Sequence, residues 1–248
     1  MKTQEKNFDG IKLSGFTAIL IMLALTGTAI YLLSLPQTPS IIAGVICGIC
    51  VVVMLPGFMI IQPNNSRVLT FFGRYAGTVI SNGFYWVNPL FLKSTVTLRI
   101  LNLNIDPIKV NDKVGNPIMI GAVVVWRIKD TYKASFDISG NIREFVQIQS
   151  DAALRQVAGM YAYDTNETID KVTLRSDESG EITQRLEDEL NSRLAIAGIE
   201  IVEARINYLA YASEIASVML RRQQADAIIS ARERIVEGAV SMVHLALE

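Results

Sequence analysis

The sequence predicts an α+β protein with an N-terminal two-helix transmembrane hairpin, a small β-rich domain, a helix-strand unit and a long C-terminal helix. Three observations lead to this prediction. Residues 13–66 contain no Asp, Glu, Lys, Arg or His, and this run is longer than the ~20 residues that cross a bilayer once. Short apolar segments with a period of two follow, up to about residue 128. Apolar residues at steps of three and four then dominate from Asn141 onward, so strands precede and separate helices, as in α+β folds.

The uncharged run contains two apolar segments, residues 15–33 and 41–54. Pro36 and Pro39 lie between them, and because proline disrupts a helix interior, they end one helix and begin the next. The first segment is too long, and too closely followed by the second, for a cleaved signal peptide. The run therefore predicts a helical hairpin that crosses the membrane twice.

Lysine and arginine residues flank the hairpin on both sides. Lys2, Lys6 and Lys12 precede it, Arg67 and Arg74 follow it, and the connecting loop has neither residue type. Short loops that carry Lys and Arg tend to stay in the cytoplasm. We therefore expect a multi-pass protein of the cell membrane with two spans, and with both termini and the domain after the hairpin in the cytoplasm.

The second apolar segment includes the sequence Gly44-Val-Ile-Cys-Gly48. Small residues at this spacing let two helix backbones approach closely, so Gly44 and Gly48 are candidate packing residues in the membrane. Their partner is either the first helix of the same hairpin or a helix of a neighbouring chain, and a chance spacing is the third alternative. Cys47 and Cys50 lie in the same segment without a charge that would lower a thiol pKa, which favours packing over redox chemistry.

The segments after the hairpin have the pattern of a sheet. Residues 95–105 alternate strictly enough to predict one half-buried strand. A turn at residues 112–116 then joins a short strand at 108–110 to a long apolar strand at 118–128, which predicts a β-hairpin. Both tryptophans lie in apolar strand-like segments, so we expect each to be at least partly buried.

Helical spacing begins at Asn141 and continues to about Met160. A second helix is predicted at about residues 180–197, and it ends at Gly198, a residue that suits a left-handed cap. Residues 199–206 form the next predicted strand. The helix-strand unit thus completes the α+β pattern.

From Ala212 to the end of the chain, only Gly238 interrupts a strongly helix-forming sequence. Apolar side chains form a broad seam along this predicted helix, and a small α+β domain has no evident surface to cover it. Neighbouring copies of the chain are the expected cover, so the seam predicts a homo-oligomer of many subunits. The residues assigned to this oligomer interface are Ile228, Ile235, Val236, Val240, Val243 and Leu247.

These patterns divide the chain into four parts. The expected parts are a cytoplasmic tail at residues 1–12, the transmembrane hairpin at 13–61, the β-rich domain with its helix-strand unit at 62–210, and the oligomerisation helix at 211–248. The net charge of -1 gives no indication of nucleic-acid binding. Membrane lipid and further copies of the chain are the expected partners.

Three segments carry a resemblance to a known family. They are Val68-Leu-Thr-Phe-Phe-Gly-Arg-Tyr75, Gly83-Phe-Tyr-Trp-Val-Asn-Pro89 and Val110-Asn-Asp-Lys-Val-Gly-Asn-Pro-Ile118. In this order they resemble the opening of the SPFH or band 7 domain of the stomatin, prohibitin and flotillin superfamily. The order of membrane segment, β-rich domain, helix-strand unit and a long helix that begins near residues 209–224 is also similar to that family. Many members have a single span or a re-entrant hairpin, whereas this chain has two long segments.

The resemblance implies a non-enzymatic scaffold whose subunits pack side by side into a large ring or cage on a membrane. Such an assembly would organise a membrane microdomain and the proteins in it. The resemblance to some relatives implies the alternative of a regulator that binds a membrane protease or another membrane protein complex. The sequence does not separate these two functions, because the surface of the partner is unknown.

Two other classes of protein fit the sequence less well. An enzyme is not expected, because the single histidine, His244, has no companion Cys or His within reach in the sequence, and no P-loop, nucleophile elbow or zinc-protease motif occurs. We therefore assign no catalytic residue, cofactor or metal ligand. A channel or transporter is disfavoured because neither apolar segment holds an ionisable residue.

Overall fold

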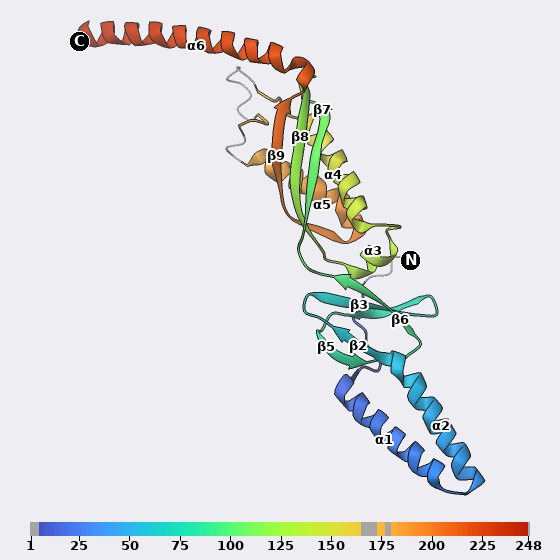
Figure 1. Cartoon of the computed structure of the whole chain (residues 1–248). Coiled ribbons are helices and arrows are strands. Elements are labelled where there is room, and N and C mark those ends of the chain that lie inside the picture. The colour runs from blue at the N-terminus through green and yellow to red at the C-terminus, as the bar shows by residue number, and fades with distance from the viewer. Residues whose placement is uncertain (1–4, 165–172, 177–179, 248) are drawn as a thin grey trace. The chain divides into compact units, whose positions relative to one another are not determined.

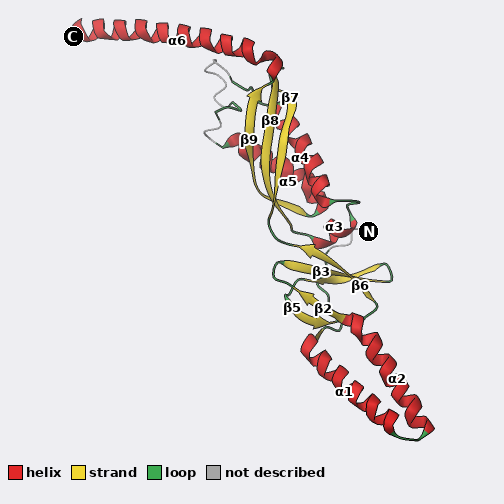
Figure 2. Cartoon of the chain, viewed as in Figure 1, coloured by secondary structure: helices red, strands yellow, loops and turns green. Residues whose placement is uncertain are grey.

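The computed structural model describes residues 5–164, 173–176 and 180–247, and the fold is α+β, as predicted (Figure 1). The chain divides into two compact units, which are described separately. The first unit comprises Met1–Leu101, Arg127–Ile142 and Leu194–Glu200, and the second comprises Asn102–Trp126, Arg143–Arg193 and Ile201–Glu248. Figure 2 distinguishes the helices from the strands of each unit by colour.

The first unit begins with the predicted apolar hairpin, formed by helices α1 (Gly15–Ser34) and α2 (Thr38–Met54). Pro39 lies in the first turn of α2, where a backbone N–H would lack an intrahelical partner in any case. α1 has 20 residues and is about 30 Å long at 1.5 Å per residue, which matches the hydrocarbon core of a bilayer. Both helices are long and apolar enough to cross a membrane.

Two small antiparallel sheets, formed mostly by residues after the hairpin, enclose a core. One sheet has the order β1-β5-β2 and the other has the order β4-β3-β6. Their strands are β1 (Leu13–Ser14), β2 (Phe58–Ile61), β3 (Asn65–Phe71), β4 (Arg74–Val79), β5 (Gly83–Trp86) and β6 (Phe91–Thr97). The buried core consists of Met59, Ile61, Leu69, Val79 and Val87.

A short helix, α3 (Thr131–Phe136), also belongs to the first unit and has no counterpart in the sequence prediction. Its N-cap is Asp130, whose side chain accepts a hydrogen bond from the backbone N–H of Lys133. The hydroxyl of Thr131 lies 2.9 Å from that of Thr78 on β4. This contact joins α3 to the sheet.

The second unit contains a sheet of order β7-β8-β9, and helices α4 and α5 lie against one face of it (Figure 1). Its elements are β7 (Leu101–Asn111), β8 (Pro117–Ile128), α4 (Ile142–Ala158), α5 (Glu181–Leu194) and β9 (Ile199–Tyr211). Alternate residues of β8 from Ile118 to Ile128 are buried, and all four leucine and isoleucine side chains of α5 are buried. The core of this unit therefore lies between the sheet and the two helices.

Several predicted boundaries are confirmed. β7 and β8 are joined at residues 112–116, where the Asp112 carboxylate accepts bonds from the backbone N–H groups of Val114 and Asn116. A 3-10 turn, η2 (Ala195–Ala197), follows α5 and ends at Gly198, which has the left-handed conformation with a φ of 68°. The turn at Asp112 and the helix cap at Gly198 both use residue types that the sequence rules favour.

The single strand predicted at residues 95–105 is wrong. β6 ends at Thr97 and β7 begins at Leu101. Between them, the backbone N–H of Leu98 donates to the Asn64 carbonyl, and that of Arg99 donates to the Thr97 hydroxyl. The chain therefore leaves the sheet without glycine or proline, and the hydrophobic alternation continues through the turn and conceals it.

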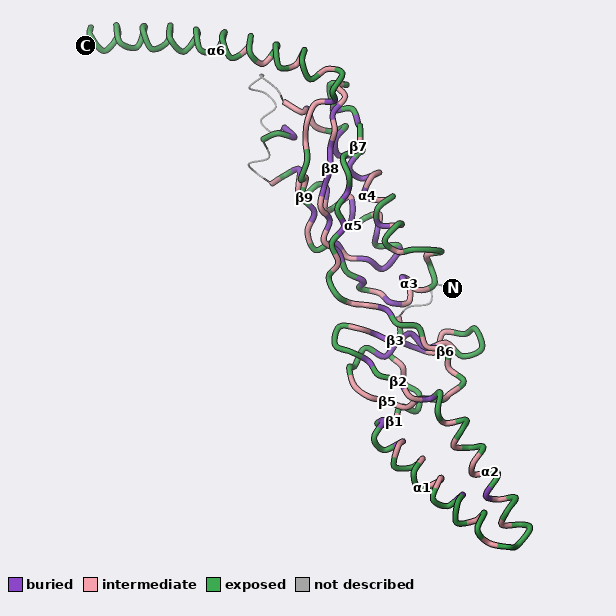
Figure 3. Tube along the Cα trace, viewed as in Figure 1, coloured by how far each residue is buried: buried purple, intermediate pink, exposed green. Residues whose placement is uncertain are grey.

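The second unit ends in α6 (Ser213–Leu247), a helix of 35 residues with no buried residue. Gly238 does not interrupt it, so the predicted long helix is confirmed. Figure 3 shows α6 exposed over almost its entire length. Ile215 and Met219 in its first turns are partly covered, and the apolar side chains from Leu220 to Leu247 are exposed.

Candidate functional site: the membrane junction and the C-terminal helix

The end of α2 is held by side chains from two strands. After Met54 the chain makes a 3-10 turn, η1 (Leu55–Gly57), before β2 begins. The indole N–H of Trp86 donates to the Met54 carbonyl at 2.9 Å. The Lys93 ammonium donates to the carbonyls of Pro56 and, at 3.5 Å, of Phe58. Carbonyls at the C-terminal end of a helix lack intrahelical partners. A cation at that end also interacts favourably with the helix dipole.

Close packing joins the hairpin to β5 at both of its ends. A methyl group at Gly15, where α1 begins, would lie 2.2 Å from the ring of Phe84. A methyl group at Gly57 would lie 2.3 Å from the indole nitrogen of Trp86. The Phe84 ring also stacks on Phe58, with centroids 5.6 Å apart. Glycine is therefore required where the chain enters and where it leaves the hairpin, because no side chain fits there.

Two cations lie together beside this junction. Arg67 on β3 and Lys93 on β6 point to the same face of their sheet, because Arg67 pairs with Thr95 and Leu69 pairs with Lys93. No acidic side chain in the described part of the chain forms an ion pair with either cation. Burial lowers the pKa of the Lys93 amine, and the neighbouring Arg67 guanidinium lowers that pKa further.

The predicted packing glycines have different surroundings. A methyl group at Gly44 would lie 2.8 Å from Cγ of Leu33 and 3.2 Å from the carbonyl oxygen of Ala29, so Gly44 lies against α1. The corresponding position above Gly48 has no other atom within 4 Å. The structure thus places only Gly44 at the contact between the two helices of the hairpin.

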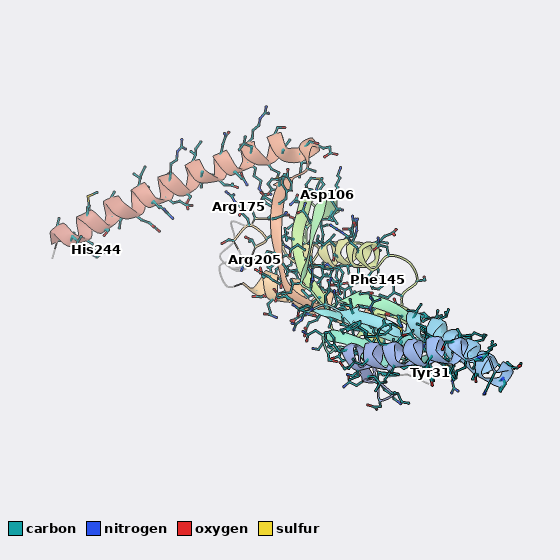
Figure 4. All side chains as sticks on the ribbon, turned by 60° about the horizontal axis from the view of Figure 1, so that its bottom comes forward. Tyr31, Asp106, Phe145, Arg175, Arg205 and His244 are labelled. Atoms are coloured by element: carbon teal, nitrogen blue, oxygen red, sulfur yellow. The ribbon has the colours of Figure 1, made fainter. Side chains whose placement is uncertain are left out.

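The six residues assigned to the oligomer interface all lie on α6, and their side chains are between 55% and 81% exposed. The first turns of α6 are attached to their own unit, since Lys109 pairs with Glu214 and the Gln223 amide donates to Asp164 at 3.3 Å. Beyond Glu237, residues 238–247 contain no Asp, Glu, Lys or Arg. Figure 4 shows side chains projecting from this helix, with His244 near its end.

The chemistry of these sites is that of binding surfaces. The described residues contain no group of three or more His, Cys, Asp and Glu side chains placed to hold a metal ion. Cys47 and Cys50 are both free thiols on α2. The junction instead offers aromatic rings, two cations and helix-end carbonyls, and α6 offers an apolar surface.

Sequence reasoning did not find the junction. Aromatic residues and lysines are typical of the ends of membrane spans, and this signal was present in Trp86 and Lys93. However, these residues lie 32 and 37 positions after the carbonyls that they bind, those of Met54 and Pro56. Their role becomes visible only once β5 and β6 are placed beside β2 and β3.

An apolar hairpin long enough to cross a membrane, with a β-rich domain held against its end, is typical of a membrane-associated protein. The comparison with family models agrees with this class. The model of the SPFH domain / Band 7 family matches residues 59–239, which is more than half of the chain. The chain therefore belongs to the SPFH, or band 7, family, whose members are generally non-enzymatic, associate with membranes and oligomerise. A comparison with curated proteins gives no match.

Proposed function

We propose that this protein is a membrane-anchored scaffold whose copies assemble through α6 into a large ring or cage and organise the membrane that they enclose. The observation that carries the proposal is the exposure of the apolar seam on α6. Contiguous apolar surface of this length is unfavourable in water and marks an interface. Membership of a family whose members generally oligomerise supports a second copy of the chain as the partner.

The spacing along the seam suits a helix-helix interface. Ile229, Val236 and Val243 recur every seven residues. Val240 and Leu247 lie four residues after Val236 and Val243. Alternating steps of four and three residues are those of coiled-coil seams. Ile228 and Ile235 widen the seam on one side of the helix. The wider apolar surface favours contact with two neighbouring helices rather than with one. Repeated head-to-tail contacts of this kind close into rings.

The seam can be tested by replacing Ile235, Val236 and Val243 together by Glu. Three buried carboxylates at a subunit contact would be repelled and desolvated, so we expect the large assembly to dissociate into small species. The full chain would be extracted in mild detergent, and native mass spectrometry and particle images would report its size. Closed rings in this variant would exclude α6 as the assembly element.

A matched control places three glutamates on the opposite side of the same helix. Ser230, Ser241 and Leu245 lie on that side at 100° per residue, and their replacement by Glu adds the same charge as in the seam variant. We expect this control to stay assembled. A chain that is monomeric before any substitution would contradict the scaffold function itself.

The proposed topology has two membrane spans, both termini in the cytoplasm and the SPFH domain on the same side. The proposed parts are a tail at residues 1–12, the hairpin at 13–61, the domain at 62–210 and the oligomerisation helix at 211–248. The distribution of Lys and Arg supports this orientation. A reporter that is active only outside the cytoplasm, fused to the C-terminal end, should be inactive, and strong activity would reverse the topology.

A further inference from the structure

The two cations beside the junction occupy an open pocket of 390 Å³ that begins where α2 ends. Arg67 and Lys93 line the pocket together with Pro56, Phe58, Met59, Ile60 and Phe84. The second apolar span ends at Gly57, which lies between two of these residues. In a bilayer that contains the hairpin, the pocket is therefore at the depth of the lipid headgroups.

Hydrogen-bonding capacity is left over in this pocket. Nε of Arg67 is buried and has no hydrogen-bond partner within the described residues. An ammonium group has three N–H donors, and Lys93 uses two of them on the Pro56 and Phe58 carbonyls. Two like charges on one face of a sheet also repel each other. An anion bound in the pocket would offset this repulsion and could accept a hydrogen bond from the third N–H of the Lys93 ammonium.

The lining of the pocket selects the kind of anion. Arginine and lysine bind phosphate oxygens well. The side chain of Ile60 is 65% exposed, and the aromatic pair of Phe58 and Phe84 forms another wall. A ligand with a charged phosphate next to apolar chains matches both kinds of wall. We propose that Arg67 and Lys93 bind the phosphate of an anionic phospholipid from the bilayer that holds the hairpin.

This inference rests on the proposed membrane anchoring, because the lipid must be present beside the end of α2. A phospholipid is favoured over free phosphate for two reasons. The bilayer supplies it at high local concentration, and its acyl chains can cover the exposed part of Ile60 and the rings of Phe58 and Phe84. Free phosphate would satisfy the cations alone and would leave these apolar side chains in water.

The test uses Trp86 as a local reporter of bound lipid. The chain has two tryptophans, and Trp126→Phe leaves Trp86, which donates to the end of α2, as the single fluorophore. The full chain would be reconstituted in phosphatidylcholine bilayers that contain brominated phosphatidylglycerol or brominated phosphatidylcholine. Bromine quenches tryptophan only at short range, so the ratio of quenching by the two lipids measures the preference for the anionic lipid.

We expect brominated phosphatidylglycerol to quench Trp86 at a lower mole fraction than brominated phosphatidylcholine. In the Arg67→Gln and Lys93→Gln double variant, this preference should fall by about fivefold for each cation removed. The control, Arg74→Gln with Arg99→Gln, removes the same charge from exposed residues that do not line the pocket. The control should keep the preference.

Three outcomes of the comparison between lipids would overturn the proposal. They are equal quenching by the two lipids in the parent chain, an unchanged preference in the double variant, and an equal loss in the control. Inorganic phosphate, added as a competitor at ~10 mM, should leave the preference intact, and its complete loss would assign the site to free phosphate. The assembly size of the same samples would be measured in parallel. A parent chain that assembles but shows no preference for the anionic lipid contradicts the lipid site alone, whereas a parent chain that is monomeric contradicts the scaffold.

Discussion

Replacing Trp126 by Ala should destabilise the second unit strongly. The Trp126 side chain is only 2% exposed on β8, and its indole nitrogen is buried without a hydrogen-bond partner within the described residues. Its contribution is therefore packing, and loss of a buried tryptophan side chain costs about 3–5 kcal/mol of unfolding free energy. Trp126→Phe keeps an aromatic ring and removes no hydrogen bond, so it should cost about half of that or less.

Hydrogen exchange measured by mass spectrometry on the full chain in detergent would give these free energies. Peptides from β8 report the opening of the second unit, and peptides from β5 in the first unit serve as an internal reference. Trp86→Phe is the matched comparison, because it removes a hydrogen bond to Met54 worth about 1 kcal/mol. A loss below about 1 kcal/mol in Trp126→Ala, or an equal loss in Trp126→Phe, would refute the packing argument.

Further predictions concern charge and membrane packing. Lys129 and Arg127 donate hydrogen bonds to Glu200 and hold its pKa below the ordinary value of 4.5. This stabilisation is present above the ordinary pKa and is lost as the pH falls through the lower folded-state pKa. Glu200→Gln should therefore flatten the acid limb of a thermal unfolding curve measured over about three pH units below neutrality, and an unchanged limb would contradict the ion pair. Gly44→Leu should separate α1 from α2 and accelerate proteolysis of the hairpin in detergent, whereas Gly48→Leu should not, and equal effects would contradict the observed contact.

Much of the architecture was predictable because it follows local rules. The absence of charge over residues 13–66 defines the hairpin, and Gly198 marks the end of the second predicted helix. The missed α3 also had a local signal, since Asp130 is a favoured N-cap residue. Its six residues are too few for a helical period to be recognised.

The junction at the membrane was not predictable from the same rules. Arg67 and Lys93 become neighbours only through the pairing of β3 with β6. Sequence patterns give each strand its inward and outward faces but do not give the register between strands separated by a loop. The break between β6 and β7 was missed for a related reason, because Thr97 closes the turn with its side chain instead of with glycine.

The attachment of both ends of the hairpin to β5 has a mechanical consequence. Helices that are too long for a thin bilayer respond by tilting. Since Gly15 packs on Phe84 and Gly57 packs on Trp86, there is no slack at either end for the hairpin to tilt alone. The two small sheets must lean with it, so the thickness of the surrounding bilayer sets the angle at which these sheets stand on the membrane. A patch of thicker or thinner lipid would thus change the angle between these two sheets and the membrane.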